Sequence, residues 1–567
     1  MGIFPKEVIA YFSMEIGLDP AIPTYSGGLG VLAGDTIRSA ADLEIPMVAV
    51  TLLYRQGYYF QNLNEEGQQS EEPYRWAIDD YLELLETRVV VELNGRTVHL
   101  GVWRYKVTGI TGFEVPVYFL DTALPENLAE DQHLTDNLYG GDSYYRLCQE
   151  VVLGIGGFKI LRALGYEQIK RFHLNEGHAA LMIPALIHET LVKRAQTAYI
   201  TPDLIDEIRE QCVFTTHTPV PAGHDQFPED LAARVLGPQR WHIVKGCGQN
   251  DHLNMTALAL HCSRFVNGVA MKHGQVSRNM FPGYPINSIT NGVHAATWAS
   301  LPFQKLYDRH LPEWRRDPFS LRYAISIPSD EIWTTHVEAK KLLLKHVNRV
   351  ANVGFDKDIF TIGFARRVTD YKRPTLLLHD IERLKSITQK VGPIQIVFAG
   401  KAHPRDQRGK ELIREIHATI KIIENDIPIA YLPNYDMALG KLLCGGVDVW
   451  LNTPLPPLEA SGTSGMKAAV NGIPSLSILD GWWVEGHIEG ITGWCIEDGL
   501  CAGIEGREPL DACHASALYA KLEEGVLPCF YKDRNRFIGI MKDVISLNGA
   551  FFNSHRMLTQ YLHQAYR

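Results

Sequence analysis

The chain has 567 residues, of which 46% are hydrophobic and 21% are charged, and its formal net charge is −10. This length exceeds one ordinary hydrophobic core and predicts about two large domains or three to four small ones. The acidic balance excludes a protein that binds nucleic acid over a broad basic surface, although a local basic pocket for a small anionic substrate remains compatible with it.

The cysteines and the N-terminal residues indicate the compartment. The nine cysteines are scattered, odd in number and without a CxxC pair, so we expect buried or reduced thiols and no disulfide framework. The segment MGIFPKEVIAYFSM lacks the apolar core and cleavage site of a signal peptide, and Lys6 breaks the myristoylation pattern. The longest apolar stretch, residues 45–54, is about half of a bilayer span. These features predict a cytoplasmic protein without a membrane partner.

The first half of the chain mixes apolar β-type runs with helical patterns. The β-type runs are VIAYF, PMVAVTLLY, RVVVEL and CVFTTHT, and the helical patterns are GDTIRSAADLE and GHAALMIPALIHETLVKRA. This mixture predicts an α/β domain over residues 1–290, with excursions from a regular alternation.

A glycine-rich segment, YSGGLGVLAG, precedes the first helical pattern. It contains G-x-G-x-x-A from Gly28 to Ala33, which is a weak dinucleotide signal. No clear strand leads into it and no acidic residue ends a second strand about 20 residues later, so NAD binding is disfavoured. A loop at Gly27 and Gly28 that lets a sugar or a phosphate approach the backbone remains open.

Three histidine-bearing segments follow. His217 comes directly after the run CVFT and either faces a cleft or is a core histidine. In HLNEGH the two histidines are five residues apart, which is not the spacing of a helical zinc motif, so we expect no metal. Asn291 and Trp298, in ITNGVHAATW, either line a cleft near the domain boundary or form a plain turn.

The most regular pattern extends from about residue 358 to residue 480. Runs such as IFTIGFA, IQIVFAG, PIAYL, VDVWLN and SLSIL alternate with helical patterns, the first of which is KRPTLLLHDIERLKSI. Strands that are apolar throughout and separated by single helices predict a parallel, Rossmann-like sheet over residues 291–545, with ligands beyond the carboxyl ends of its strands. The amphipathic stretch in residues 546–567 could pack on either domain.

Two segments at these strand ends suit anions. RRVTDYKR, residues 366–373, has four cations and is either a phosphate site or a solvated basic loop; Lys401 follows the next strand. EASGTSGMK, residues 459–467, follows VDVWLN and opens a helix, where backbone N–H groups can hold an anion. Lys467 could pair with a phosphate or form a Schiff base; the alternative is a polar turn with a surface lysine.

Ten collinear segments together resemble the α-glucan phosphorylases, the family of glycogen, starch and maltodextrin phosphorylases, in the wording of its short bacterial and archaeal branch. They are YFSMEIGL, YSGGLGVLAG, YRQGYYFQ, HLNEGHAAL, FTTHTPVPAGHDQF, FVNGVAMKHG, ITNGVHAATW, FARRVTDYKR, VFAGKAHPRD and LEASGTSGMKAAVNG. The resemblance implies a GT-B fold, in which two Rossmann-like domains face a deep active-site cleft and the last helix returns to the first domain. It also implies a retaining glycosyltransferase that uses inorganic phosphate and pyridoxal 5′-phosphate to release α-D-glucose 1-phosphate from the non-reducing end of an α-1,4-glucan.

The resemblance further implies a role for each candidate residue. The cofactor set is Lys467 as the cofactor lysine, Thr463, Ser464 and Arg366 at its 5′-phosphate, Tyr435 and Trp298 near its ring, and the loop at Gly27 and Gly28. The catalytic set is Arg367 and Lys372 at the substrate phosphate, with His217 and Lys467. The substrate set is Glu459, Ser461, Gly462 and Tyr371 for glucose hydroxyls, and His217 and Asn291 for the 6-hydroxyl. Two adjacent phosphates repel each other strongly, and the cation cluster would offset that repulsion.

Two alternatives and several expectations stay open. A GT-B sugar-nucleotide-dependent glucosyltransferase, similar to glycogen synthase and without pyridoxal phosphate, would leave Lys467 unused. A non-catalytic glucan-binding protein is disfavoured because every candidate residue is present. Leu455 and Pro456 stand where the short branch carries basic residues, which bears on acceptor contacts. Since the resemblance begins at Val8, we expect no N-terminal regulatory segment and no allosteric switch by AMP or phosphorylation. A homodimer, the preferred glucan and the reaction direction remain undetermined by sequence.

Overall fold

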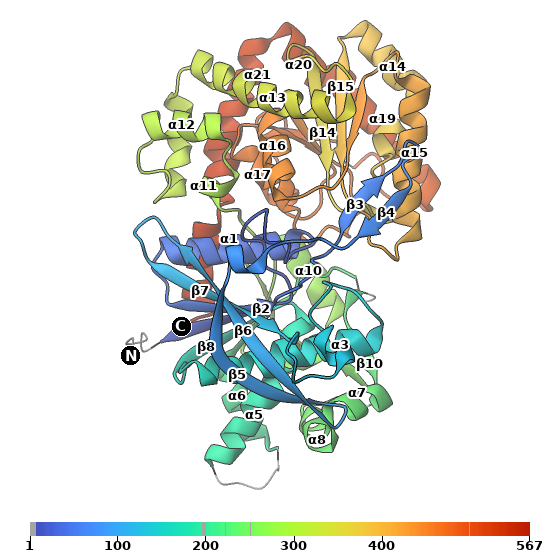
Figure 1. Cartoon of the computed structure of the whole chain (residues 1–567). Helices are drawn as coiled ribbons and strands as arrows, with labels where there is room; N and C mark the ends of the chain where they lie inside the picture. Colours follow the sequence, from blue (N-terminus) through green and yellow to red (C-terminus); the bar gives the residue numbers. More distant parts are fainter. Residues whose placement is uncertain (1–6, 195–199, 221–222, 250, 498) are drawn as a thin grey trace. The chain divides into compact units, whose positions relative to one another are not determined.

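The computed structural model describes the chain in two compact units, each of which is considered by itself (Figure 1). The first unit holds the described residues up to Tyr59, together with residues 73–290 and 557–567, and the second holds residues 60–72 and 291–556. The described residues are 7–194, 200–220, 223–249, 251–497 and 499–567. The expectations about a leader and a myristoylation signal concern residues 1–6 and lie outside these ranges.

The first unit is built on a nine-stranded sheet with the order β13-β12-β9-β8-β1-β2-β7-β6-β5. The strands from β13 to β7 pair in parallel, whereas β5 and β6 are antiparallel additions at one edge. The predicted runs fall in β1, β2, β5 and β9, and the sequence reading missed the other five strands. The bounds are β1 Val8–Ser13, β2 Met47–Leu52, β5 Glu83–Leu93, β6 Arg96–Thr108, β7 Glu114–Asp121, β8 Ile169–Asn175, β9 Cys212–Thr215, β12 Phe265–Gly268 and β13 Ile286–Ser288.

Helices cover both faces of this sheet and bury its apolar side chains. One face packs against α1 (Gly28–Asp42) and the end of α22 (Ser554–Gln564), whose Met557, Leu558 and Tyr561 join the same buried cluster as Tyr11 of β1. The opposite face buries Phe12 of β1 with residues of α5 (Met182–Lys193) and its neighbours. Side chains of one strand therefore alternate between two cores, as the period of a β-strand requires.

The second unit contains a six-stranded sheet in which every neighbouring pair is parallel. Its order, β16-β15-β14-β17-β18-β19, is the order of doubly wound nucleotide-binding sheets. The prediction of a parallel sheet in this region is confirmed. The strands are β14 Phe360–Ala365, β15 Ile394–Ala399, β16 Ile429–Leu432, β17 Val449–Asn452, β18 Ser475–Ser477 and β19 Gly493–Cys495, and the main helices are α13 Ser329–Ala351, α14 Ile381–Lys390, α15 Gln407–Ile423, α16 Met437–Gly446, α17 Thr463–Ala469 and α19 Arg507–Lys521.

The predicted helix KRPTLLLHDIERLKSI begins later than its apolar pattern indicated. Its first half forms only short 3-10 turns, at Asp370–Lys372 and Leu376–Leu378, and α14 begins at Ile381. Pro374 explains the error, because proline has no N–H group and is disfavoured in a helix interior. Asp380 then starts α14 by accepting a hydrogen bond from the Arg383 N–H over 2.9 Å.

A hairpin from the N-terminal half of the sequence belongs to the second unit. It consists of β3 (Phe60–Leu63) and β4 (Gln69–Glu72), which pair antiparallel. Figure 1 shows it in blue beside the orange α15, and Glu71 forms an ion pair with Lys410 of that helix at 2.7 Å. The second unit is therefore assembled from segments that are more than 300 residues apart in sequence.

The cysteines correct one expectation. Cys501 and Cys513 form a disulfide, with their Cα atoms 6.0 Å apart, and the other seven cysteines are buried and unbonded. The pairing depends on the turn that brings Cys501 back onto α19, which a spacing of 12 residues does not reveal.

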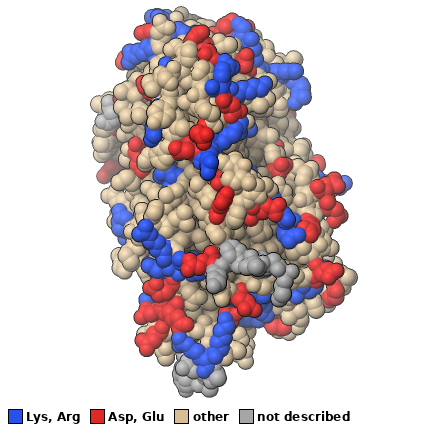
Figure 2. All heavy atoms as spheres, turned by 90° about the vertical axis from the view of Figure 1, so that its left-hand side faces the viewer, with Lys and Arg blue, Asp and Glu red and all other residues tan. Residues whose placement is uncertain are grey.

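Two further observations concern apolar helices and surface charge. Within the described ranges, no helix is both long and apolar enough to cross a membrane. Figure 2 shows Lys and Arg interspersed with Asp and Glu on the face that it draws. Such a mixed face differs from the continuous basic surface by which proteins bind nucleic acid.

Candidate active site

A buried carboxylate between two cations lies beyond the carboxyl ends of the second sheet. One oxygen of Glu459 accepts hydrogen bonds from Arg366 Nη2 at 2.6 Å and from Lys372 Nζ at 2.5 Å. Burial alone would raise the pKa of Glu459, but the charges of Arg366 and Lys372 outweigh it and hold the pKa at about 2. Glu459 is therefore a permanent anion that can only accept hydrogen bonds.

The strand order of the sheet explains why these three residues meet. Arg366 directly follows β14, Lys372 lies in the turn after it, and Glu459 lies in the loop after β17. β14 and β17 are neighbours on either side of the point where the strand order reverses, which is where open α/β sheets bind ligands.

Several buried polar atoms near Glu459 have unused hydrogen-bonding capacity. Arg366 Nε and Nη1 and Ser461 Oγ are buried and have no hydrogen-bond partner among the described residues. Buried polar atoms are nearly always paired in native proteins, so such a group indicates a ligand or water position. Two nitrogen atoms of the Arg366 guanidinium, Nε and Nη1, are thus left for an anion after its contact with Glu459.

Lys467 is a buried lysine stacked on an aromatic ring. Its Nζ lies 3.9 Å from the centre of the Trp298 ring, and the two residues are only 7% and 2% exposed. The alternative of a surface lysine is therefore wrong. Lys467 lies in α17, which follows Gly462 in a left-handed backbone conformation with φ of 87°. A close approach also explains Gly465, because an added Cβ would lie 2.8 Å from the Trp482 ring.

Asp480 and Trp482, which the sequence analysis did not single out, form hydrogen bonds with the backbone of the loop that carries Glu459. The carboxylate of Asp480 accepts the backbone N–H of Glu459 at 2.8 Å, and the backbone N–H of Trp482 donates to the Ser461 carbonyl at 2.9 Å. Burial raises the pKa of Asp480 to about 6. Their only sequence signal is that they follow β18 at the same edge of the sheet.

The side chains of the other candidate residues of the second unit differ in their exposure to solvent. Arg367 is exposed, whereas Tyr371 and Tyr435 are half-buried. Lys372 Nζ lies 4.5 Å above the Tyr371 ring. Burial opposes the shift, but the charge of Lys372 is the principal influence that lowers the pKa of Tyr371.

Three further candidates of the second unit are Lys401, Thr463 and Ser464. Burial lowers the pKa of Lys401 to about 8. Thr463 and Ser464 open α17, and Ser464 Oγ accepts the Trp450 indole N–H at 3.2 Å.

The first unit has a different polar edge, at the ends of β8 and β9. His217 Nε2 lies 2.7 Å from Asn175 Oδ1, and the His217 N–H donates to Glu176 over 2.7 Å. The amide of Asn175 donates to Ser13, so its Oδ1 is an acceptor and His217 Nε2 carries the proton. Burial lowers the pKa of His217 well below its ordinary value, which leaves the ring neutral.

Glu176 is a strained and buried residue that the sequence reading passed over. Its φ of 71° is unusual for a residue other than glycine, and its carboxylate also accepts the Thr218 hydroxyl at 3.0 Å and the Gly177 N–H at 3.1 Å. Burial raises the pKa of Glu176 to about 7 despite these donors. Strain combined with a shifted pKa at a strand end is typical of a functional position.

The glycine loop is held by a second carboxylate that sequence reasoning missed. Glu15, just beyond β1, accepts the N–H groups of Ser26 at 2.5 Å and Gly27 at 3.1 Å. A Cβ added to Gly27 or Gly28 would meet no atom of the described chain within 4 Å, whereas one at Gly30 would lie 2.7 Å from Glu15. The backbone at Gly27 and Gly28 is thus open, and Gly30 is required for packing.

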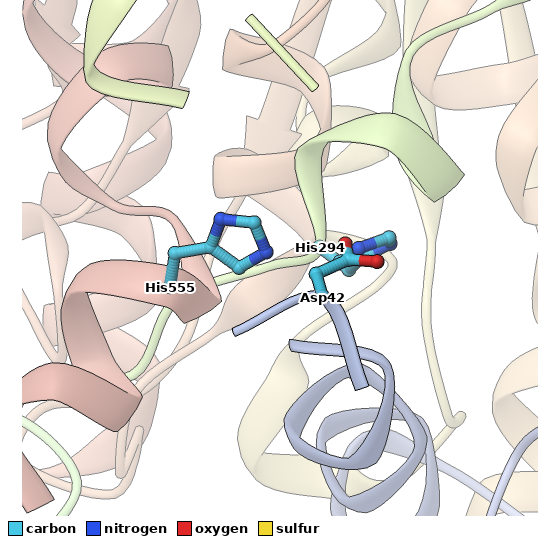
Figure 3. Close-up of side chains that lie close together, drawn as sticks. All are labelled: Asp42, His294 and His555. Atoms are coloured by element: carbon cyan, nitrogen blue, oxygen red, sulfur yellow. The ribbon is translucent and has the colours of Figure 1, made fainter. Parts of the chain in front are cut away.

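Asn291 and its neighbours begin the second unit. Asn291 Oδ1 is buried without a hydrogen-bond partner in the described part of the chain, while the Asn291 carbonyl accepts from Arg556 at 2.9 Å. Figure 3 shows the nearby rings of His294 and His555, whose centres are 5.8 Å apart. Asp42, which Figure 3 also draws, belongs to the first unit.

Comparison with known proteins identifies the family. The sequence model of the family described as carbohydrate phosphorylase matches residues 239–490. The chain is 37% identical to the maltodextrin phosphorylase of Thermococcus litoralis, over 99% of this chain and 71% of that protein. It is 36% identical to the glycogen phosphorylase of Mycobacterium tuberculosis, over 98% of this chain and 70% of that protein. The chain belongs to the carbohydrate phosphorylase family. The glycogen phosphorylase of Aquifex aeolicus is 35% identical, over 99% of this chain and 86% of that protein.

Membership of the carbohydrate phosphorylases makes the chain a glycosyltransferase and confirms the resemblance carried by its ten segments. The individual roles of the site residues stay predictions. In the second unit, direct contacts join Arg366 and Lys372 to Glu459, and Lys467 to Trp298. Gly27, Gly28 and His217 belong to the first unit, where His217 is hydrogen-bonded to Glu176 and Asn175.

Proposed function

We propose that the protein is an α-1,4-glucan phosphorylase that uses inorganic phosphate to release α-D-glucose 1-phosphate from the non-reducing end of a glucan, with retention at the anomeric carbon. The observation that carries the proposal is the pairing of buried Glu459 with Arg366 and Lys372 at one edge of a doubly wound sheet, together with a buried Lys467 in the helix that follows Glu459. The named relatives, a maltodextrin phosphorylase and glycogen phosphorylases, support this substrate class.

The residues around Lys467 fit pyridoxal 5′-phosphate. Lys467 provides a buried primary amine over the Trp298 ring, and two guanidinium nitrogens of Arg366 have no partner among the described residues. Thr463, Ser464 and Arg366 would hold the 5′-phosphate, with Trp298 and Tyr435 near the ring. When bound, the cofactor supplies a phosphate group that exchanges a proton with the substrate phosphate.

The chain's own residues would bind and orient the reacting groups. Arg367 and Lys372 would hold the substrate phosphate, and their positive charge would offset the repulsion between two phosphates and stabilise the phosphate against a developing oxocarbenium ion. Because Glu459 stays ionised, it would accept hydrogen bonds from glucose hydroxyls and would not donate a proton. Ser461 Oγ, which has no partner among the described residues, would serve a further hydroxyl, with Gly462 and Tyr371.

His217 of the first unit and Asn291 of the second would contribute the remaining sugar contacts. His217 would act as a neutral hydrogen-bonding group for the 6-hydroxyl, together with Asn291, and not as a general acid. The open backbone at Gly27 and Gly28 would face the phosphates. We further propose that the two units are the two domains of a GT-B enzyme with its active-site cleft, and that the enzyme is cytoplasmic.

A direct assay tests the proposal. The purified protein is incubated with maltodextrin and phosphate, and glucose 1-phosphate is measured while the near-ultraviolet spectrum reports bound pyridoxal phosphate. We expect both signals. A protein that forms no glucose 1-phosphate but transfers glucose from a sugar nucleotide would be the synthase-like glucosyltransferase instead.

A further inference from the structure

Two glutamines of the β3–β4 hairpin are buried and fully engaged in hydrogen bonds. Gln61 and Gln69 are only 1% and 6% exposed, and Gln61 Nε2 donates to Gln69 Oε1 at 2.8 Å. Burying two amides is unfavourable unless all their polar atoms find partners. The hairpin therefore places these side chains at positions where specific partners exist.

The partners are backbone groups at the carboxyl ends of β15 and β16. Gln61 Nε2 donates to the Gly400 carbonyl at 3.0 Å, and Gln61 Oε1 accepts the Asn434 N–H at 2.8 Å. Gln69 Oε1 accepts the Ala402 N–H at 3.1 Å, and Gln69 Nε2 donates to the Ala402 carbonyl at 2.8 Å. The glutamine pair, Gln61 and Gln69, thus holds the residues on both sides of Lys401 and the residue before Tyr435.

The segment held by the glutamine pair in turn supports the cation loop, residues 366–373. The Arg366 N–H donates to the Ala399 carbonyl at 3.1 Å, and the Val368 N–H donates to the Lys401 carbonyl at 2.9 Å. Gly400 lies against Arg366 so closely that an added Cβ would be 2.1 Å from the Arg366 carbonyl oxygen. Movement of Gly400–Ala402 would therefore displace the backbone of Arg366 and its neighbours.

We propose that Gln61 and Gln69 are positioning residues of the phosphate site, which fix the Gly400–Ala402 segment and through it the cation loop. They would touch neither phosphate nor cofactor. The inference rests on the proposed phosphorolysis and adds to it a segment from the N-terminal half of the chain, more than 300 residues away in sequence. Groups that hold a charged loop in one geometry lower the reorganisation needed when the anion binds.

The test compares Gln61→Met and Gln69→Met with Gln68→Met in the same hairpin. Gln68 is exposed, and its side chain accepts a hydrogen bond from the Asn64 amide at 3.5 Å. Methionine keeps the length of the side chain and removes its amide. In the full-length holoenzyme we expect each buried variant to raise the KM for phosphate by about three- to tenfold, as one lost hydrogen-bonded support would, with an unchanged KM for glucan. Gln68→Met should match the wild type.

Two readouts separate positioning from general stability. Amide hydrogen exchange over residues 366–368 and 400–402 should accelerate in the buried variants, and pyridoxal phosphate should be lost faster on dialysis. Variants that fold, melt within a few degrees of Gln68→Met and share its phosphate KM, exchange and cofactor retention would overturn the proposal.

A milder change covers the case in which the methionine variants do not fold. Glu71→Gln removes the ion pair with Lys410 and weakens the acceptor that Gln69 Nε2 uses at 2.7 Å. The same selective rise in phosphate KM would support the positioning role, and its absence would reject it. The phosphorolytic activity of the wild-type protein is measured separately, and its absence would reject the proposed function. If amide hydrogen exchange at residues 400–402 is the same in the variants as in the wild type, the positioning role alone is rejected.

Discussion

The carboxyl edges of the two sheets use their acidic residues in opposite ways. At the edge of the second sheet, Glu459 is paired with two cations, and its pKa falls to about 2. At the edge of the first sheet, Glu176 accepts hydrogen bonds from backbone N–H groups and a hydroxyl, and burial raises its pKa to about 7. The histidine beside it is neutral.

The difference shows that an equivalent topological position does not fix the chemistry of an edge. Both edges lie where parallel strands end, where ligands bind in α/β proteins. Fixed cations favour an anionic ligand, whereas neutral donors and acceptors favour hydroxyl groups. In the proposed function the second edge would bind phosphate through its cations and glucose hydroxyls through Glu459, whereas the neutral His217 at the first edge would bind only a glucose hydroxyl. The following experiments test these roles.

The largest effect is expected at Lys467. Lys467→Ala should remove covalently bound pyridoxal phosphate and lower kcat by on the order of a thousandfold or more, because the amine that binds the cofactor is lost. Borohydride reduction of the wild type followed by peptide mass mapping should place the pyridoxyl label on Lys467. Lys467→Arg is the control that keeps the charge. A label on another lysine would reject the assignment.

Arg367 should have the next largest effect. Arg367→Ala should raise the KM for phosphate and lower kcat/KM by about 3–4 kcal/mol in transition-state free energy, while pyridoxal phosphate stays bound. Arg366→Ala is the matched comparison, since it should release the cofactor. If the Arg367 variant loses the cofactor and keeps its phosphate kinetics, the two arginines have exchanged roles.

The second unit was the more predictable half because its signals are local. The continuous apolar runs of β14, β15 and β17 are typical of strands buried on both faces, and the cations of residues 366–373 follow the first of them directly. The start of α14 was misplaced because Pro374 interrupts a pattern that looks helical in its apolar positions alone.

The missed features depend on contacts between distant parts of the sequence. The role of Glu15 requires the fold that brings it to Ser26 and Gly27, and the docking of Gln61 beside Gly400 joins residues 339 positions apart. Strand β6, next to the edge strand β5, mixes polar and apolar residues along its length, so it lacks the continuous apolar run of a buried strand. No local pattern encodes which partner such a residue meets.

The two carboxylates should respond oppositely to pH. Because the pKa of folded Glu176 is about 7, above the ordinary 4.5, the folded state keeps a proton that the unfolded state releases, and the free energy of unfolding falls as pH rises between these values. The full loss is on the order of 3 kcal/mol. Glu459 has a lowered pKa, so its stabilisation is present above the ordinary pKa and is lost as pH falls toward 2.

Urea unfolding from about pH 5 to about pH 8 measures the difference. Glu176→Gln should flatten the decline seen in the wild type over this range, whereas Glu459→Gln should leave its slope unchanged and lower stability at every pH, because two buried cations lose their partner. Equal slopes in the wild type and Glu176→Gln would show that Glu176 is ionised in the folded protein.

The smallest effect is expected at His217, where it also distinguishes the two edges most directly. His217 Nε2–H is engaged by Asn175, so the ring's remaining polar atom is the acceptor Nδ1, and one hydrogen bond to the glucose 6-hydroxyl is the most it can provide. Losing such a bond should reduce kcat/KM by about tenfold in the synthesis direction, with glucose 1-phosphate as donor. The 6-deoxy analogue of glucose 1-phosphate cannot make this bond, so His217→Ala should leave the already lower kcat/KM for that analogue nearly unchanged.

The KM for phosphate should not change in His217→Ala, because the neutral ring contributes no charge to the phosphate edge. An equal loss with both donors would mean that His217 supports the first unit's edge without contacting the 6-hydroxyl, and a raised phosphate KM would mean that His217 also acts on the phosphate.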